Sequence, residues 1–206
     1  MTWRDGVDGH DLAAGSAAAE AARIVRSRVD LSGLPPLCRA VTEQIICASA
    51  DLTYATDLVC SEPWLLAAAS ALAEGAPLIA DSAMVGAGIS GYPLICKAGE
   101  PLTARLSRTA GISPAAAAVR LALGEAGPGA IWVVGSEPAA IYEILARGAS
   151  PALVIGMPAG FAGTAEAKQA LRDSGAPCLT NLSEKGGPAV AAAGCMALLR
   201  CDQPAG

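Results

Sequence analysis

Short apolar runs recur along the whole chain, and they alternate with Ala-rich stretches of helical character. Each run has four to six residues and is followed by a Gly or Pro break before the next Ala-rich stretch. This alternation is typical of a parallel sheet whose strands are joined by helices. We therefore predict an α/β fold with a parallel, doubly wound, Rossmann-like sheet that is flanked by helices on both faces.

The same pattern predicts where the strands and helices lie. We expect strands at residues 58–60, 77–80, 93–96, 130–134, 152–156 and 178–180. We expect helices at residues 11–28, 36–50, 64–73, 102–108, 114–125, 138–147, 164–173 and 187–200, with Ser61 as the N-cap of the third. Strand 77–80 has no charge on either face, which favours a place inside the sheet. We find no linker, so residues 1–206 are expected to form one domain, with 1–10 and 201–206 as loose tails.

The composition makes several classes of protein improbable. The chain has 206 residues, of which 53% are hydrophobic, and a net charge of −5. An acidic surface has no general attraction for phosphate backbones or anionic lipids, so we expect no nucleic-acid and no membrane partner. The longest run without charge, 148–165, contains prolines that argue against a spanning helix, and the N-terminus lacks a signal-peptide pattern. We expect a cytoplasmic protein whose seven cysteines are reduced.

Glycine-rich loops follow three of the predicted strands. Ligands bind beyond the carboxyl ends of parallel strands, which places residues 81–88, 135–137 and 156–168 at the edge of a site. The Gly spacing in 156–168 fits neither the dinucleotide fingerprint nor the Walker phosphate loop. A ligand-binding loop and a tight strand-to-helix loop fit this segment about equally well. Asp81 can bind a ligand or cap the next helix, and capping is the commoner role.

Nucleophilic and metal sites find little support in the residue inventory. The single histidine, His10, lies near the N-terminus, so no second His is available as a base or ligand. A Ser-His-Asp triad and a zinc site both fit poorly, and we expect no bound metal. Cys47 follows Ile45 and Ile46 on a predicted helix, and this local pattern alone favours a structural thiol.

Three motifs together resemble the precorrin-8X methylmutase family. They are APLIADSAMVGAGI at 76–89, GMPAGFAGTAEAK at 156–168 and KGG at 185–187, and the likeness extends over roughly residues 23–199. The resemblance implies an α/β fold with a parallel sheet and a homodimer with sites near the subunit interface. It also implies an isomerase of cobalamin synthesis that moves a methyl group from C11 to C12 of a corrin precursor. The product is hydrogenobyrinic acid or its cobalt counterpart, and the rearrangement uses no redox cofactor.

The chain departs from the family at the polar positions of the site. The family's Arg-x-x-His pattern, with His as the acid, falls on Gln44 and Cys47, and an early site serine falls on Ala21. Its Thr-Arg-Ser appears as residues 112–114, and its Gly-Asn-Ala-Pro-Thr as residues 135–139. The resemblance places Cys47 at the proton-donor position. The expected substrate-binding residues are Gln44, Asp81, Met84, Ser113, Ser136, Gly160, Lys168 and Lys185.

These departures leave three hypotheses for the function. The first is a methylmutase with Cys47 as the acid, slowed because a thiol is about two pKa units less acidic than an imidazolium, or roughly 2.7 kcal/mol. The second is a non-catalytic protein that binds a tetrapyrrole or corrin on the same scaffold. The third is an isomerase recruited to another apolar, conjugated substrate.

Overall fold

The structure is a computed structural model that describes residues 14–201. The expected tail 1–10, with His10, and residues 202–206 lie outside this range, as does the start of the first expected helix. In chain order the elements are α1 (Ala14–Arg28), α2 (Pro36–Ser49), α3 (Tyr54–Asp57), β1 (Leu58–Val59), α4 (Glu62–Ala73), β2 (Leu78–Ala80), α5 (Ala83–Ala87), α6 (Pro101–Ala110), α7 (Pro114–Ala126), β3 (Ile131–Val134), α8 (Pro138–Ala146), β4 (Leu153–Gly156), α9 (Thr164–Asp173), β5 (Cys178–Asn181) and α10 (Pro188–Arg200).

Proline sets the start of most of these helices. It occupies one of the first two positions of α2, α4, α6, α7, α8 and α10, where its missing N–H costs no helical hydrogen bond. Ser113 caps α7 by accepting a hydrogen bond from the backbone N–H of Ala116 at 3.2 Å. Ser61 holds the expected N-cap position of α4, but its side chain makes no capping hydrogen bond.

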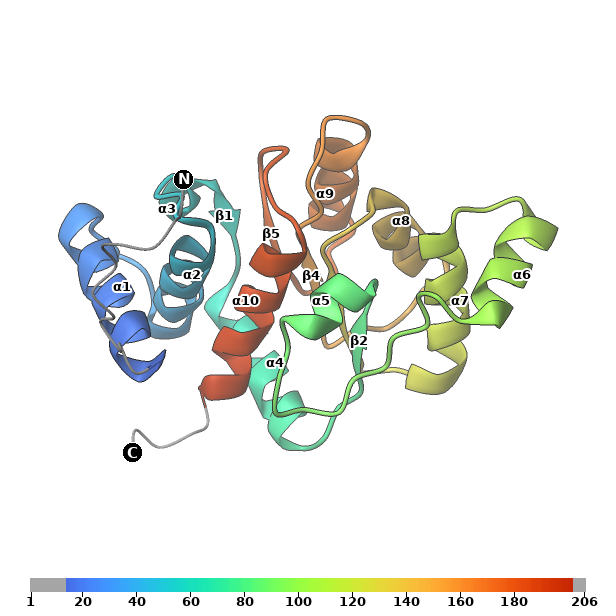
Figure 1. The fold of residues 1–206 in the computed structure, drawn as a ribbon, viewed down its shortest axis with the longest axis horizontal. Coiled ribbons are helices and arrows are strands. Elements are labelled where there is room, and N and C mark those ends of the chain that lie inside the picture. Colours follow the sequence, from blue (N-terminus) through green and yellow to red (C-terminus); the bar gives the residue numbers. More distant parts are fainter. Residues whose placement is uncertain (1–13, 202–206) are drawn as a thin grey trace, which may run out of the picture.

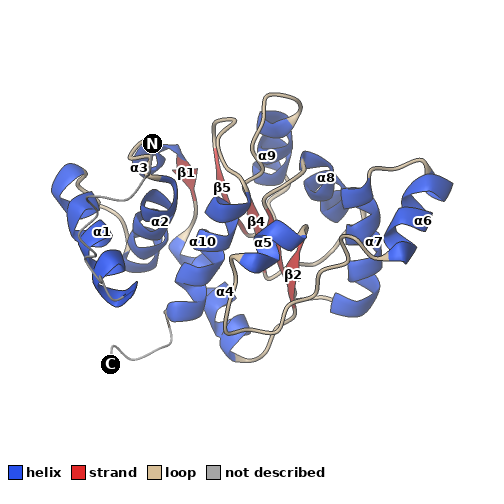
Figure 2. Ribbon diagram, viewed as in Figure 1, coloured by secondary structure: helices blue, strands red, loops and turns tan. Residues whose placement is uncertain are grey.

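The five strands form one sheet in the order β1-β5-β4-β3-β2 (Figures 1 and 2). Strands β2 to β5 are parallel and stand in chain order, whereas β1 runs antiparallel to β5 at one end. The α/β fold predicted from the alternating pattern is therefore confirmed, with a sheet that is parallel except for β1. The carboxyl ends of β2 to β5 lie at one edge of the sheet, which we call the carboxyl edge.

Helices cover both faces of the sheet. Successive strand residues point to opposite faces, so Ile131 and Ile155 pack with α2, α4 and α10, while Trp132 and Val154 pack with α7, α8 and α9. Figure 1 shows α10 in front of the sheet, with α2 and α1 beside it. Within residues 14–201, no helix is both long and apolar enough to cross a membrane.

The expected place of strand 77–80 inside the sheet was wrong, because β2 is the last named strand at its end of the sheet. Its outer edge is covered by the chain around Ile95. The backbone N–H of Ile95 donates to the carbonyl of Leu78, and that of Ala80 donates to the carbonyl of Ile95, both at 2.9 Å. The expected strand 93–96 is thus reduced to a single bridge. This cover lets an uncharged strand end the sheet without exposing its backbone.

Candidate functional site

A groove of about 1060 Å³ lies between α1, α2 and α10. Ala21 from α1 and both Gln44 and Cys47 from α2 line it. Gln44 and Cys47 are three residues apart, so they share one face of the helix. The groove therefore brings together the three positions that the family resemblance assigns to the first part of the site.

The thiol of Cys47 is half-buried in this groove. Burial raises its pKa, the nearby carboxylate of Glu43 raises it further, and the guanidinium of Arg26 opposes both effects. The thiol is therefore neutral at pH 7 and carries a proton that it can donate.

An ion pair joins the two helices beside Cys47. Arg26 of α1 donates two hydrogen bonds to the carboxylate of Glu43 on α2, from Nε at 2.7 Å and from Nη2 at 2.8 Å. This fork holds α1 against the groove. Sequence reasoning missed both residues, although Glu43 lies four positions before Cys47 and so on the same helix face.

Asp81 lies at the carboxyl edge, directly after β2, and is 7% exposed. Its Oδ2 accepts backbone N–H bonds from Gly135, Ser136 and Glu137 at 3.2, 2.7 and 3.4 Å. Burial raises the pKa of this carboxyl group, and the three N–H bonds oppose the shift. Asp81 thus fixes the loop after β3. It is not the N-cap of α5, which is Ser82, and it is absent from the described lining of the groove.

Ser136 and Met84 stand beside Asp81. The hydroxyl of Ser136 donates to that of Ser82 at 2.6 Å, which ties the loop after β3 to the start of α5. The side chain of Met84, on α5, is 66% exposed. Among the described lining residues of the groove, Asp81, Met84, Ser113 and Ser136 are all absent.

Lys168 is fully buried in the first half of α9. Its Nζ donates to the backbone carbonyls of Ser183 and Lys185 at 2.9 and 2.5 Å. Burial lowers its pKa to about 8, mainly by disfavouring the charged form. The ammonium of Lys168 therefore supports the loop after β5.

Two glycines let the loops after β4 and β5 approach each other. Gly160 has φ 137° and donates its N–H to the carbonyl of Glu184 at 3.0 Å. Gly186 has φ 151°, and a Cβ there would overlap the carbonyl of Met157. Both positions require glycine because of this backbone geometry.

Lys185 connects the loop after β5 to the end of α2. Its Nζ is 2.8 Å from Oδ2 of Asp51 and 3.8 Å from Oδ2 of Asp57, and it also bonds the hydroxyl of Thr53. The same ammonium lies 4.4 Å from the ring centroid of Tyr54. Lys185 is thus occupied by groups of its own chain, and the two aspartates that hold it were not expected from the sequence.

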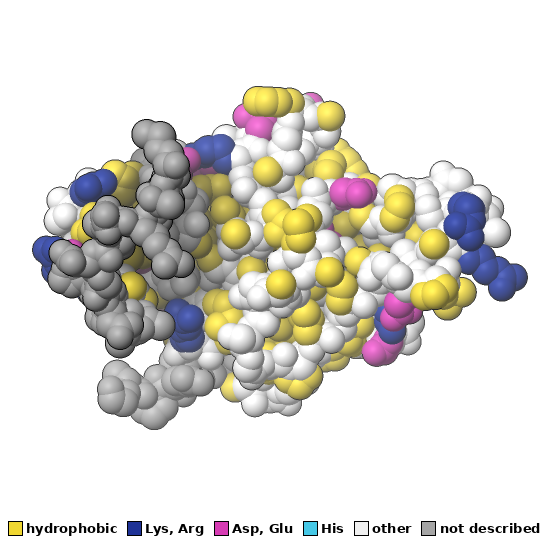
Figure 3. All heavy atoms as spheres, viewed as in Figure 1, with side chains coloured by type: hydrophobic (Ala, Val, Ile, Leu, Met, Phe, Trp, Pro, Cys, Tyr) yellow, Lys and Arg dark blue, Asp and Glu magenta, His cyan; other side chains and the backbone are white. Residues whose placement is uncertain are grey.

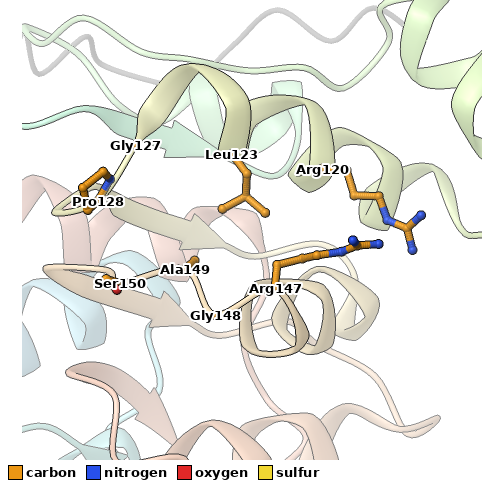
Figure 4. Close-up of a pocket in the computed structure, with 8 residues that line it drawn as sticks. All are labelled: Arg120, Leu123, Gly127, Pro128, Arg147, Gly148, Ala149 and Ser150. Carbon is orange, nitrogen blue, oxygen red and sulfur yellow. The ribbon is translucent and has the colours of Figure 1, made fainter.

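A second cavity, of about 470 Å³, lies near the amino ends of β3 and β4 (Figure 4). The side chains of Arg120 and Arg147 lie close together there. Both guanidinium groups bond the carboxylate of Glu143, with Nε to Oε1 distances of 2.5 and 2.7 Å. None of these three residues was expected from the sequence, and the carboxylate neutralises one of the two positive charges.

The CbiC family model, described as precorrin-8X methylmutase, matches residues 17–201 of the chain. The cobalt-precorrin-8 methylmutase of Methanothermobacter thermautotrophicus is 36% identical over 182 residues, which cover 85% of this chain and 87% of the relative. That of Salmonella typhimurium is 32% identical over 183 residues, again covering 85% of this chain and 87% of the relative.

Solved structures show the same likeness in three dimensions. The precorrin-8X methylmutase of Thermus thermophilus superposes with a TM-score of 0.80 at 30% identity, over 88% of this chain and 93% of that one. A precorrin-8X methylmutase related protein gives 0.79 at 24% identity and so supports the fold alone. The sequence comparisons and the structural comparisons of this chain point to the same family. The chain belongs to the precorrin-8X methylmutase family.

Proposed function

We propose that the chain is a methylmutase of cobalamin biosynthesis that moves a methyl group from C11 to C12 of the corrin precursor. The product is hydrogenobyrinic acid or its cobalt counterpart. The observation that carries this proposal is the single groove lined by Ala21, Gln44 and Cys47. The family resemblance assigns these three positions to the polar site. Family membership supports the reaction class.

The reaction requires few polar groups from the protein. The bond from the methyl group to C11 breaks and one to C12 forms, so nothing is oxidised or reduced and no cofactor is needed. The protein must orient the ring and polarise it with one proton. In this proposal the neutral thiol of Cys47 lends its proton to the conjugated ring and recovers it after the shift. Gln44 supplies an uncharged hydrogen bond beside it.

In this proposal, four more of the expected residues would join the site only in an assembly. Asp81, Met84, Ser113 and Ser136 lie outside the groove of one chain, and a homodimer would bring a second set beside it. Met84 is 66% exposed, and Figure 3 shows a largely uncharged surface over α5 and α10, which suits contact with a second copy. We therefore propose a homodimer, and light scattering at several protein concentrations tests it. We also propose a cytoplasmic location, where the cysteines would stay reduced.

Incubation of the pure protein with precorrin-8X tests the activity. We expect slow conversion to the hydrogenobyrinic acid spectrum, loss of turnover in Cys47→Ala and a gain of at least tenfold in Cys47→His, because imidazolium is the stronger acid. Cys96→Ala is the matched control, since this half-buried thiol lies outside the described groove lining. No turnover above a protein-free blank would sink the mutase assignment.

A second candidate is a non-catalytic protein that binds a tetrapyrrole or corrin. Gln44 and Cys47 favour it, because they stand where the family has Arg and His. Hydrogenobyrinic acid bound without any turnover of precorrin-8X, in the wild type and in Cys47→His, would support this candidate. Absence of both binding and turnover would leave an isomerase of another conjugated substrate.

A further inference from the structure

The groove is basic although the chain is acidic. Its described lining includes Arg26, Arg28, Arg39 and Arg200 but only two acidic residues, Asp30 and Glu43. The whole chain, in contrast, has a net charge of −5. The positive charge is therefore concentrated where a ligand would lie, and a ligand with several carboxylates is attracted to it.

Three of these charged groups already have hydrogen-bond partners within the chain. Arg26 is paired with Glu43 through two hydrogen bonds. The carboxylate of Asp30 accepts the backbone N–H of Ser32 at 2.8 Å and so serves its own loop. Within residues 14–201, neither Arg39 nor Arg200 has an acidic partner at ion-pair distance.

Arg39 and Arg200 lie at the same end of the groove. Helices α2 and α10 pack closely together. The contact of Lys185 with Asp51 puts the end of α2 beside the start of α10, so the two helices run antiparallel. The first turn of α2, with Arg39, is therefore next to the last turn of α10, with Arg200. Figure 1 shows α2 and α10 as neighbouring helices.

Cys47 lies in the last turn of α2, at the other end of the groove. It is eight residues from Arg39, a rise of about 12 Å along the helix. This length suits a macrocycle that places a ring carbon at the thiol and its peripheral side chains at the arginines. Ala40, Glu43 and Gln44 line the groove between these two ends.

The helix dipole accounts for the position of Arg200 but not for that of Arg39. Arg200 is in the last turn of α10, where the helix dipole favours a cation. Arg39 is in the first turn of α2, where the dipole disfavours one. The carboxylate of Glu62 lies at that helix start. Its two oxygens accept hydrogen bonds from the backbone N–H groups of Leu37 and Cys38, at 2.9 and 2.8 Å, and it makes no ion pair with Arg39 among the described residues.

We propose that Arg39 and Arg200 bind the peripheral carboxylates of the tetrapyrrole at the end of the groove opposite Cys47. This inference rests on the proposed function, because it assigns a ligand to the same groove. The pair supplies part of the anion binding that Gln44 and Ser113 cannot, since these residues stand where the family has arginines. Its role is to position the ring and to select ligands that carry acid side chains.

Spectral titration with hydrogenobyrinic acid tests this pair. We expect Arg39→Gln and Arg200→Gln each to weaken binding roughly tenfold, the lower range for a charge-assisted hydrogen bond because both side chains are exposed. Added salt should weaken wild-type binding more than that of the double variant. The permethyl ester of the same macrocycle carries no charge and should bind all variants equally.

Arg105→Gln is the matched control, because Arg105 is exposed on α6 and absent from the described groove lining. Circular dichroism checks that each variant is folded. Equal binding by Arg39→Gln, Arg200→Gln and Arg105→Gln would overturn the proposal, as would no binding by the wild type. Weakened binding in a protein that never turns over precorrin-8X would refute the mutase activity and leave the carboxylate site standing.

Discussion

The loops at the carboxyl edge and the groove beside α2 both hold residues that the sequence suggests for a site, but they use them differently. At the carboxyl edge, Asp81 and Lys168 are buried and bind backbone groups of neighbouring loops. In the groove, Gln44 and Cys47 are half-buried and line open space. Long motifs at the carboxyl edge therefore identify the scaffold, whereas the groove holds the side chains of the proposed site.

This difference has a chemical basis. A buried lysine or aspartate that holds a loop cannot be exchanged without removing hydrogen bonds from several backbone groups. A residue facing open space can change while the fold persists. Substitutions on the two sides should thus separate effects on stability from effects on binding.

The largest expected effect is that of Lys168→Met. This change keeps the apolar stem but removes the ammonium from the carbonyls of Ser183 and Lys185, which then keep only the amide of Asn181 as a donor, at 3.2 and 3.0 Å. At pH 9, above the pKa of the buried amine, we expect a loss of about 1–3 kcal/mol in the free energy of unfolding, because two buried carbonyls lose their shorter hydrogen bond. Urea denaturation measures it. Gln169→Met, at the next and exposed position, is the control, and equal stabilities of the two variants would contradict the comparison.

The second effect is a dependence on pH. Burial lowers the pKa of Lys168 from 10.5 to about 8, so between these values the unfolded chain binds more protons than the folded one. Unfolding free energy therefore rises with pH in this window, and the buried charge is unfavourable below it. Relative to Lys168→Met, the wild type should gain stability from pH 8 to 10.5. A flat or falling difference would show that this amine is not desolvated as described.

A smaller gain is expected from Ala50→Gly, at the junction of the two regions. Ala50 ends α2 with φ 55°, a left-handed conformation that costs a residue with a Cβ about 1–2 kcal/mol. Part of the relief is offset by the freedom of glycine in the unfolded chain, which leaves about 0.5–1 kcal/mol. Thermal unfolding measures the gain. Ala48→Gly, inside the same helix, should instead lose about 1 kcal/mol.

The smallest effect on stability is expected from Gln44→Ala. The side chain faces the groove, and the described structure gives it no hydrogen-bond partner within the protein, so unfolding free energy should change by about 0.5 kcal/mol or less. Turnover or tetrapyrrole binding should fall all the same. A loss of stability as large as that of Lys168→Met would contradict the view that residues lining the groove contribute little to the stability of the fold.

Much of the fold can be predicted from local sequence. Every expected helix is present within residues 14–201, and the Ala-rich stretches that follow Pro explain where most of them start. The place of β2 could not be predicted, because it depends on which distant segment covers the strand. Here the chain around Ile95 does so, through two backbone hydrogen bonds that leave no mark on the pattern of side chains.

The candidate site is predictable only in part. Gln44 and Cys47 follow from one helical motif and its resemblance to a family. The burial of Lys168 does not, because a lysine usually reaches solvent and its two acceptors are backbone carbonyls from another loop. Arg39 and Arg200 come from opposite ends of the chain, so only the packing of α10 on α2 reveals that they lie together.

The packing of α10 on α2 also determines when the groove can exist. It joins residues 36–49 to residues 188–200, and contacts between such distant segments form slowly because a long loop must close first. The groove is thus absent until the first and last thirds of the chain have docked. A tetrapyrrole held between Cys47, Arg39 and Arg200 would stabilise that docked state by mass action. It would thereby hold together the two ends of the segment that runs from α2 to α10.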